Sequence, residues 1–81
     1  MNLKITGCSV PLAELGVGER GRLVIAQAPI PQRLRELGLV PGTWVLVVRR
    51  GPLGDPVELE LRGYRLCVRR SDLAGLEVDP Q

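Results

Sequence analysis

The sequence lacks several residue types on which common catalytic and metal-binding sites depend. Its 81 residues include no histidine, no phenylalanine and only two aromatic side chains, Trp44 and Tyr64. Without an imidazole, the chain cannot build Ser-His or Cys-His nucleophile systems or a histidine-bearing zinc site. Grooves that bind proline-rich peptides are lined by several aromatic rings, so that mode of recognition is also disfavoured. We therefore expect a protein that is not an enzyme.

Cysteines and long apolar runs are equally scarce. Cys8 and Cys67 lie far apart and form no CxxC pattern, so we expect two free thiols, no metal site and no bound cofactor. No apolar run approaches the roughly 18–20 residues of a membrane span, and the first ten residues lack the pattern of a signal peptide. These features predict a cytoplasmic chain that does not insert into a membrane.

The charge of the chain is segregated although its net value is only +2. Residues 49–70 carry six arginines against three acidic residues, whereas residues 71–81 carry three acidic residues and no base. Ten of the eleven basic residues are arginine. The planar guanidinium group favours fork-like contacts with carboxylates or phosphates. The same composition also fits a solvated barrel surface, and the sequence does not choose between the two.

Glycine and proline interrupt the sequence about every ten residues, a spacing typical of short strands joined by turns. Strands are expected over 20–26 and 43–49, in an alternating hairpin over 57–69, and over 76–78. Trp44 lies within the most apolar of these segments, which predicts that its ring belongs to the core. The length allows one domain, 1–81 with a core at about 9–78. We predict a mostly β fold, a small SH3-like β-barrel of about five strands with one or two short helices; a five-stranded OB-type barrel is the second choice.

The strongest helical signal lies between residues 29 and 42. Ile30, Leu34 and Leu37 follow helical spacing, Pro31 suits the first helical position, and Gly38 suits a left-handed cap. Pro41-Gly42 then predicts a type II turn. Shorter helical turns are expected at 11–15 and 71–74, capped by Ser9 and Ser71.

The hairpin over 57–69 allows a register to be predicted. A two-residue type II′ turn at Gly63-Tyr64 would pair Leu61 with Leu66 and place all apolar side chains on one face. The same register sets Glu58 opposite Arg69 and turns Cys67 outward beside Glu60.

The longest exposed loop is expected between the strand at 43–49 and this hairpin. The segment Gly51-Pro52-Leu53-Gly54-Asp55-Pro56 contains two prolines, which lack amide donors, and two glycines, which admit unusual dihedral angles. Such a segment presents an apolar and an acidic side chain beside the neighbouring arginines.

The residues that specify these turns also resemble a known family. The segments Leu34–Gly42, Pro52–Val57 and Arg62–Arg69, in this order, are similar to the signatures of the ferrous iron transport protein A (FeoA) family, and the likeness extends from about Ser9 to Val78. The resemblance implies a cytosolic SH3-like module that assists the B-type ferrous iron transporter, a membrane protein whose cytosolic part is a GTPase. Two positions depart from the family pattern: Cys67 stands where a small residue such as alanine is usual, and Gly51 replaces an alanine.

The leading hypothesis is therefore an accessory protein of ferrous iron uptake that binds the cytosolic region of this transporter. The candidate partner-binding residues are those of the exposed loop with the flanking arginines and the end of the helix: Arg35, Gly38, Arg49, Arg50, Pro52, Leu53, Gly54, Asp55 and Pro56. No catalytic, cofactor-binding or metal-binding residue is assigned.

Alternative functions remain open at this stage. The arginines of 49–70 are compatible with a small nucleic-acid-binding barrel, although the interleaved acidic residues and the lack of aromatic rings oppose it, so no nucleic acid is expected. A stand-alone homologue of the C-terminal domain of metal-dependent repressors is a further alternative. Self-association and the mode of action on the transporter, including an arginine that activates its GTPase, are left undecided.

Overall fold

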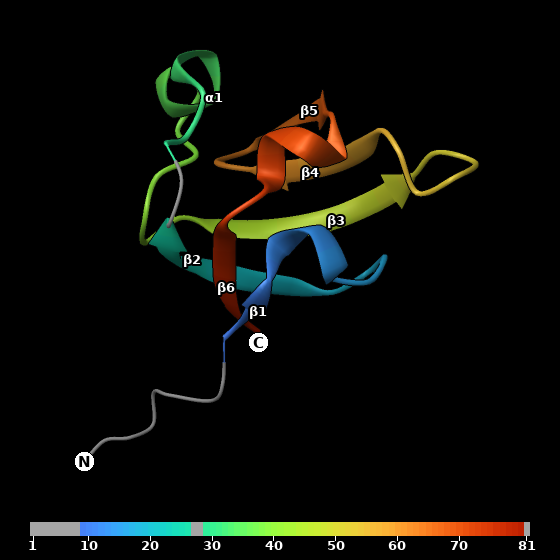
Figure 1. Cartoon of the computed structure of the whole chain (residues 1–81), viewed down its shortest axis with the longest axis horizontal. Helices are drawn as coiled ribbons and strands as arrows, with labels where there is room; N and C mark the ends of the chain where they lie inside the picture. Colours follow the sequence, from blue (N-terminus) through green and yellow to red (C-terminus); the bar gives the residue numbers. More distant parts are fainter. Residues whose placement is uncertain (1–8, 27–28, 81) are drawn as a thin grey trace.

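The computed structural model describes residues 9–26 and 29–80, which fold as one antiparallel sheet with three short helical segments (Figure 1). In chain order the elements are β1 (Val10–Pro11), the 3-10 turn η2 (Leu12–Glu14), β2 (Arg20–Ala26), α1 (Gln32–Glu36), β3 (Trp44–Arg50), β4 (Val57–Leu61), β5 (Tyr64–Val68), η3 (Arg70–Leu73) and β6 (Leu76–Pro80). The strands are ordered β1-β6-β2-β3-β4-β5. The predicted mostly β class is confirmed, and the strand that the sequence did not reveal is the two-residue β1, which pairs with β6 through Val10 and Val78.

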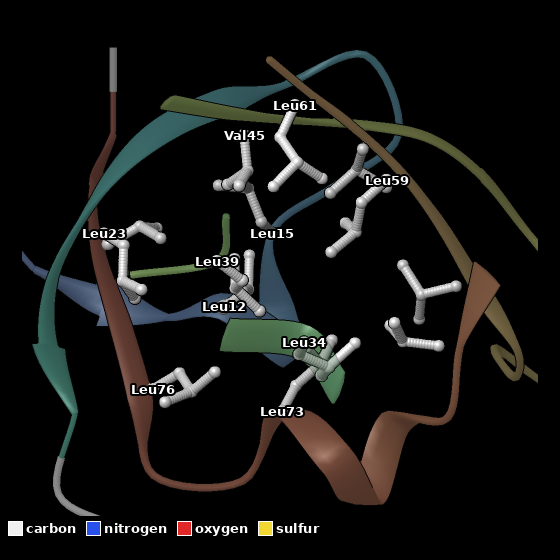
Figure 2. Close-up of a cluster of buried hydrophobic side chains, with 14 of the residues drawn as sticks. Leu12, Leu15, Leu23, Leu34, Leu39, Val45, Leu59, Leu61, Leu73 and Leu76 are labelled. Carbon is white, nitrogen blue, oxygen red and sulfur yellow. The ribbon is translucent and has the colours of Figure 1, made fainter. Parts of the chain in front are cut away.

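The sheet curves around a core of leucine and valine side chains (Figure 2). Alternate residues of the strands point into it, which explains why Val45 and Val47 of β3 are buried while Leu46 between them is only half-buried. Leu34 from α1 and Leu73 from η3 point into the same core and are fully buried. The helical segments therefore contribute to a single core that the sheet alone would leave open.

The helix α1 is shorter than the sequence predicted. Because the backbone turns after its last residue, Leu39 is buried and Leu37 is not. It begins after Pro31 and stops at Glu36, and Gly38 adopts a left-handed φ of +103°. The amide of Leu39 then donates to the carbonyl of Leu34 at 2.9 Å, which together with the glycine forms a Schellman motif. Leu39 is buried and Leu37 is 39% exposed, so the buried face that helical spacing indicates for Ile30, Leu34 and Leu37 does not extend to Leu37.

The two serines predicted to cap helical turns do not cap them. The hydroxyl of Ser9 donates instead to the carboxylate of Glu77 on β6, at 2.7 Å. At η3, Ser71 makes no side-chain cap, and the amide of Arg70 donates to the Asp55 carboxylate at 2.8 Å. The first turn of η3 is thus capped by a side chain 15 residues away in sequence.

The predicted strands over 20–26 and 43–49 correspond to β2 and β3, and the hairpin to β4 and β5. The type II turn at Pro41-Gly42 is confirmed by the positive φ of Gly42, +97°, and by the bond from the Thr43 amide to the Val40 carbonyl at 3.1 Å. Cys67 is an exposed free thiol. The prediction for Cys8 concerns a residue outside the described ranges.

The turn of the hairpin lies one residue earlier in the sequence than predicted. Leu61 pairs with Tyr64 and Glu60 with Arg65, so the turn residues are Arg62 and Gly63, with φ of +52° and +88°. Two positive φ values define a type I′ turn, which, like the predicted type II′ turn, has a twist that matches that of the flanking strands. Cys67 consequently lies opposite Glu58, and the predicted pairing of Glu58 with Arg69 is wrong. The pairing is shifted by two residues relative to the prediction. Because side chains alternate between the two faces of a strand, this shift leaves the apolar side chains on one face.

This turn predicts a stabilising substitution. Arg62 is the only described residue other than glycine with a positive φ, and asparagine adopts that conformation more readily. The aliphatic part of the Arg62 side chain also packs over Gly38. Loss of this contact in the variant offsets part of the gain in stability. For Arg62→Asn we expect the free energy of unfolding to rise by about 0.5 kcal/mol, measured by urea denaturation. A decrease of similar size would show that the contact between Arg62 and Gly38 stabilises the domain by more than the positive φ of Arg62 destabilises it.

Candidate partner-binding site

The loop over residues 51–56 closes on itself through backbone hydrogen bonds. The amide of Gly51 donates to the Pro56 carbonyl at 2.8 Å, and the amide of Gly54 donates to the Gly51 carbonyl at 2.9 Å. A Cβ atom added at Gly51 would overlap with the carbonyl group of Asp55, so the close approach of these two backbone segments requires glycine. At the tip of the loop, the side chain of Leu53 is 91% exposed.

Arg50 holds the loop to another part of the chain. Its guanidinium group donates to the carbonyls of Ala13, at 2.8 Å, and Leu15, both in the segment around η2. It also donates to the carbonyl of Gly54 in the loop itself, at 3.4 Å. Because one guanidinium group satisfies carbonyls of two segments, the loop is tied to the body of the domain at its base.

Asp55 provides a second attachment on the other side of the loop. Its carboxylate accepts the hydrogen bond from the Arg70 amide that caps η3. The side chain is half-buried and oriented towards the domain. Neither Arg50 nor Asp55 is therefore a freely exposed charge, and together they hold the backbone on both sides of Leu53.

The remaining predicted site residues fall into two groups. Pro52 is exposed at the loop, Pro56 at its base, and Arg49 forms an ion pair with Glu58 at 3.0 Å on the outer face of the sheet. Arg35 and Gly38 lie at the end of α1, at the opposite side of the molecule from the tip of the loop (Figure 1). Arg35 donates to the carbonyl of Ile30 at 3.1 Å. The single surface predicted from the sequence is thus divided: the loop residues lie beside Arg49 and Arg50 but away from Arg35 and Gly38.

Two shallow hollows flank the base of the loop. One of about 380 Å³ is lined by Arg33, Asp55, Pro56, Cys67, Val68 and Arg69. The other, of about 250 Å³, lies between Arg49, Glu58 and Cys67 beside Gly51 and Pro56. Pro56 and Cys67 belong to both, so the loop stands between two depressions with Leu53 projecting beyond them.

Trp44 lies at the surface of the domain, contrary to the prediction from the sequence. Trp44 begins β3 with its side chain on the outer face, 45% exposed, and the guanidinium carbon of Arg20 lies 5.3 Å from the centre of its ring. Strand alternation was the signal available in the sequence. Trp44 is separated by even numbers of residues from Leu46 and Val48, and by odd numbers from the buried Val45 and Val47. The prediction that Trp44 belongs to the core is wrong.

The structure also bears on metal binding and membrane insertion. Within residues 9–26 and 29–80, no group of three or more cysteine, aspartate or glutamate side chains is arranged to hold a metal ion. None of the helices in these ranges is long and apolar enough to cross a membrane. What the fold and the site define is a small antiparallel β domain that presents a firmly attached loop.

Comparison with known proteins identifies the family of this domain. The sequence matches the FeoA domain over residues 10–80. It is 34% identical over 70 residues to a protein of Porphyromonas gingivalis (strain ATCC BAA-308 / W83) described as an Fe(2+) transport protein A/Fe(2+) transporter FeoB fusion protein. The match covers 84% of this chain and only 8% of that much longer relative.

Solved structures agree with this match. The FeoA protein of Chlorobium tepidum superposes with a TM-score of 0.75 at 37% identity, covering 86% of this chain and 70% of that protein. The zinc complex of FeoA from Stenotrophomonas maltophilia, described as a procaryotic SH3 domain protein, has a TM-score of 0.72 at 27% identity, covering 89% of this chain and 95% of that one. The predicted SH3-like fold is confirmed. The chain belongs to the FeoA domain family, whose members are small accessory domains of ferrous iron transport and not a class of enzymes.

Proposed function

We propose that this chain is a cytosolic accessory protein of ferrous iron uptake that binds the cytosolic region of a FeoB-type transporter through the loop 51–56. Family membership supports the pathway. The Porphyromonas relative supports the partner, since in that protein the two components are fused into one polypeptide. Fusion keeps two components at a high effective concentration, as is expected of domains that act on each other.

The observation that carries the choice of surface is the presentation of Leu53. A large apolar side chain, 91% exposed, stands on a loop whose backbone is held by Arg50 on one side and by Asp55 on the other. Binding through such a loop loses little conformational entropy, because the segment is already ordered in the free protein. Pro52 and Pro56 reduce the freedom of the loop further.

The arrangement of the arginines weighs against the nucleic-acid alternative. Arg49 and Arg65 are engaged in ion pairs with Glu58 and Glu60, and Arg50 is directed into the domain. A nucleic-acid surface would align free cations along one face and interleave them with stacking aromatic rings.

Replacing Leu53 by aspartate tests the proposed surface. We expect Leu53→Asp to weaken binding to the purified cytosolic region of a FeoB-type transporter at least tenfold, because a charge would be forced into an apolar contact. The thermal midpoint should change by no more than about 2 °C, since the side chain makes little contact with the domain. Isothermal titration calorimetry measures the first quantity and differential scanning fluorimetry the second.

Val17→Asp is the matched control, because Val17 is also an exposed apolar residue, at 59%, but lies in the turn before β2. It should bind the transporter region within twofold of the unmodified chain. If Leu53→Asp also binds normally, the loop is not the contact surface. Arg50→Glu would be an unsuitable test, because it removes an attachment of the loop as well as a charge.

A further inference from the structure

The outer face of the sheet carries a second candidate surface, centred on the only tryptophan of the chain. Trp44 opens β3, whereas the loop 51–56 follows the other end of this strand. The guanidinium group of Arg20 lies over the indole ring, which leaves the ring edge and the donors of Arg20 at the surface. Arg22 is the neighbour of Trp44 across the β2-β3 pairing and is also exposed.

A hollow adjoins this tryptophan. It has a volume of about 170 Å³, and its lining includes Arg20, Trp44, Glu60 and Arg62. Pockets for small-molecule ligands usually measure about 300–1,000 Å³, so this depression is too small and too open for such a ligand. Its size suits one side chain of a peptide that lies across the surface.

The charges around the hollow are unbalanced. Arg20 and Arg62 form no ion pair among the described residues, whereas Glu60 is already paired with Arg65 at 3.2 Å. The hollow therefore offers two guanidinium groups whose donors are not used by carboxylates of the chain, and these groups match carboxylates in geometry and charge.

We propose that this surface, which we call the Trp44 surface and define by Arg20, Trp44 and Arg62, binds an acidic peptide segment of a protein partner. A carboxylate of the segment interacts with Arg20 and Arg62, and a neighbouring apolar side chain packs against the indole. Nucleic acid fits less well, because the hollow is lined by one aromatic ring, which cannot stack a run of bases. The Trp44 surface is separate from the loop 51–56, so it extends the proposed function without depending on it.

Trp44 itself reports binding, since its fluorescence is the only tryptophan signal of the chain. We would titrate the full chain with a capped decapeptide of alternating glutamate and leucine, and with glutamine-leucine and lysine-leucine peptides of the same length. We expect a saturable change in Trp44 emission with the acidic peptide only. Binding should weaken at least threefold between about 50 and 200 mM salt, because the charges are exposed.

Three variants locate the site. Arg20→Gln and Arg62→Gln should each weaken binding of the acidic peptide at least fivefold. Arg69→Gln removes an exposed arginine that lines a different hollow, beside Cys67, and should change binding less than twofold. Circular dichroism and thermal midpoints establish that all three variants are folded.

Several outcomes would overturn the proposal. These are an absence of saturable binding, equal binding of the neutral peptide, and equal weakening by Arg69→Gln, which would indicate a non-specific charge effect. Tighter binding of a single-stranded oligonucleotide than of the acidic peptide would assign the surface to nucleic acid instead. Because the probe is a synthetic peptide, failure here leaves the transporter test with Leu53→Asp unaffected.

Discussion

Arg50→Met is expected to lower the free energy of unfolding by about 2–4 kcal/mol, although position 50 is only half-buried. Methionine keeps a long apolar side chain but removes every donor, so the carbonyls of Ala13 and Leu15 lose their charged partner. The bond to Gly54 within the loop is lost as well. In a domain of this size such a change corresponds to a fall of the thermal midpoint by roughly 4–8 °C for each kcal/mol.

The neighbouring residue provides the matched control. Arg49 forms one ion pair with Glu58 on the outer face and has no role in holding the loop. Arg49→Gln should therefore cost less than about 1 kcal/mol. Urea denaturation followed by circular dichroism measures both variants. Equal losses for the two arginines would show that Arg50 is an ordinary surface residue and that the loop is not attached through it.

The same substitution connects stability to the proposed binding. If the attachment of the loop presents Leu53 in a fixed position, Arg50→Met should also weaken binding to the transporter region under conditions in which the variant is fully folded. The loop would then have to be ordered on binding, at a cost in conformational entropy.

Leu34→Ala is the second substitution with a large expected effect. Leu34 is fully buried in the core and also receives the hydrogen bond that ends α1, through its backbone carbonyl. Removal of the side chain leaves a cavity between α1 and the sheet, and we expect a loss of about 2–5 kcal/mol in the free energy of unfolding. At the upper limit the domain would be largely unfolded at physiological temperature, because the total stability of small domains is about 5–15 kcal/mol.

Leu37→Ala tests the corrected assignment of the helix. The residue has the same type and lies in the next turn of the predicted helical pattern, but it is 39% exposed beyond the end of α1. We expect a loss of less than about 1 kcal/mol. Thermal and urea unfolding of both variants give the comparison. A loss for Leu37→Ala as large as for Leu34→Ala would place Leu37 in the core, as helical spacing alone predicts.

The helix illustrates why periodicity identified the element but not all of its contacts. Pro31 and Gly38 marked its two ends correctly to within one residue. Helical spacing continues beyond Glu36 in the sequence, whereas the backbone turns at Gly38 and presents Leu39 to the core instead of Leu37. The spacing of apolar residues indicates which face of a helix is buried, but only the path of the backbone beyond the helix decides which later residue completes the contact.

In the candidate site as well, the spacing of residues does not indicate which side chain faces the domain. Arg49 and Arg50 are adjacent residues of one type, and strict alternation from Val45 and Val47 would turn Arg49 inward. An irregularity in the pairing of β3 with β4, between Val47 and Arg49, reverses the alternation. Arg49 then faces Glu58 on the outer surface, and Arg50 reaches the carbonyls near η2. No local property of the sequence distinguishes the two arginines.

By itself, the sequence determined the mostly β class, the extent of the main strands, the exposed loop and the family, because turn residues and alternating apolar positions are local properties of the chain. Its lack of histidine and of aromatic residues also determined which chemistries and which peptide-recognition mode to set aside. Only the tertiary structure decided that Arg50 and Asp55 form the hydrogen bonds that hold the loop, and that Cys67 lies opposite Glu58 in the hairpin. These assignments depend on contacts between segments far apart in the chain, on one irregularity in the sheet and on the register of a hairpin, none of which residue spacing specifies.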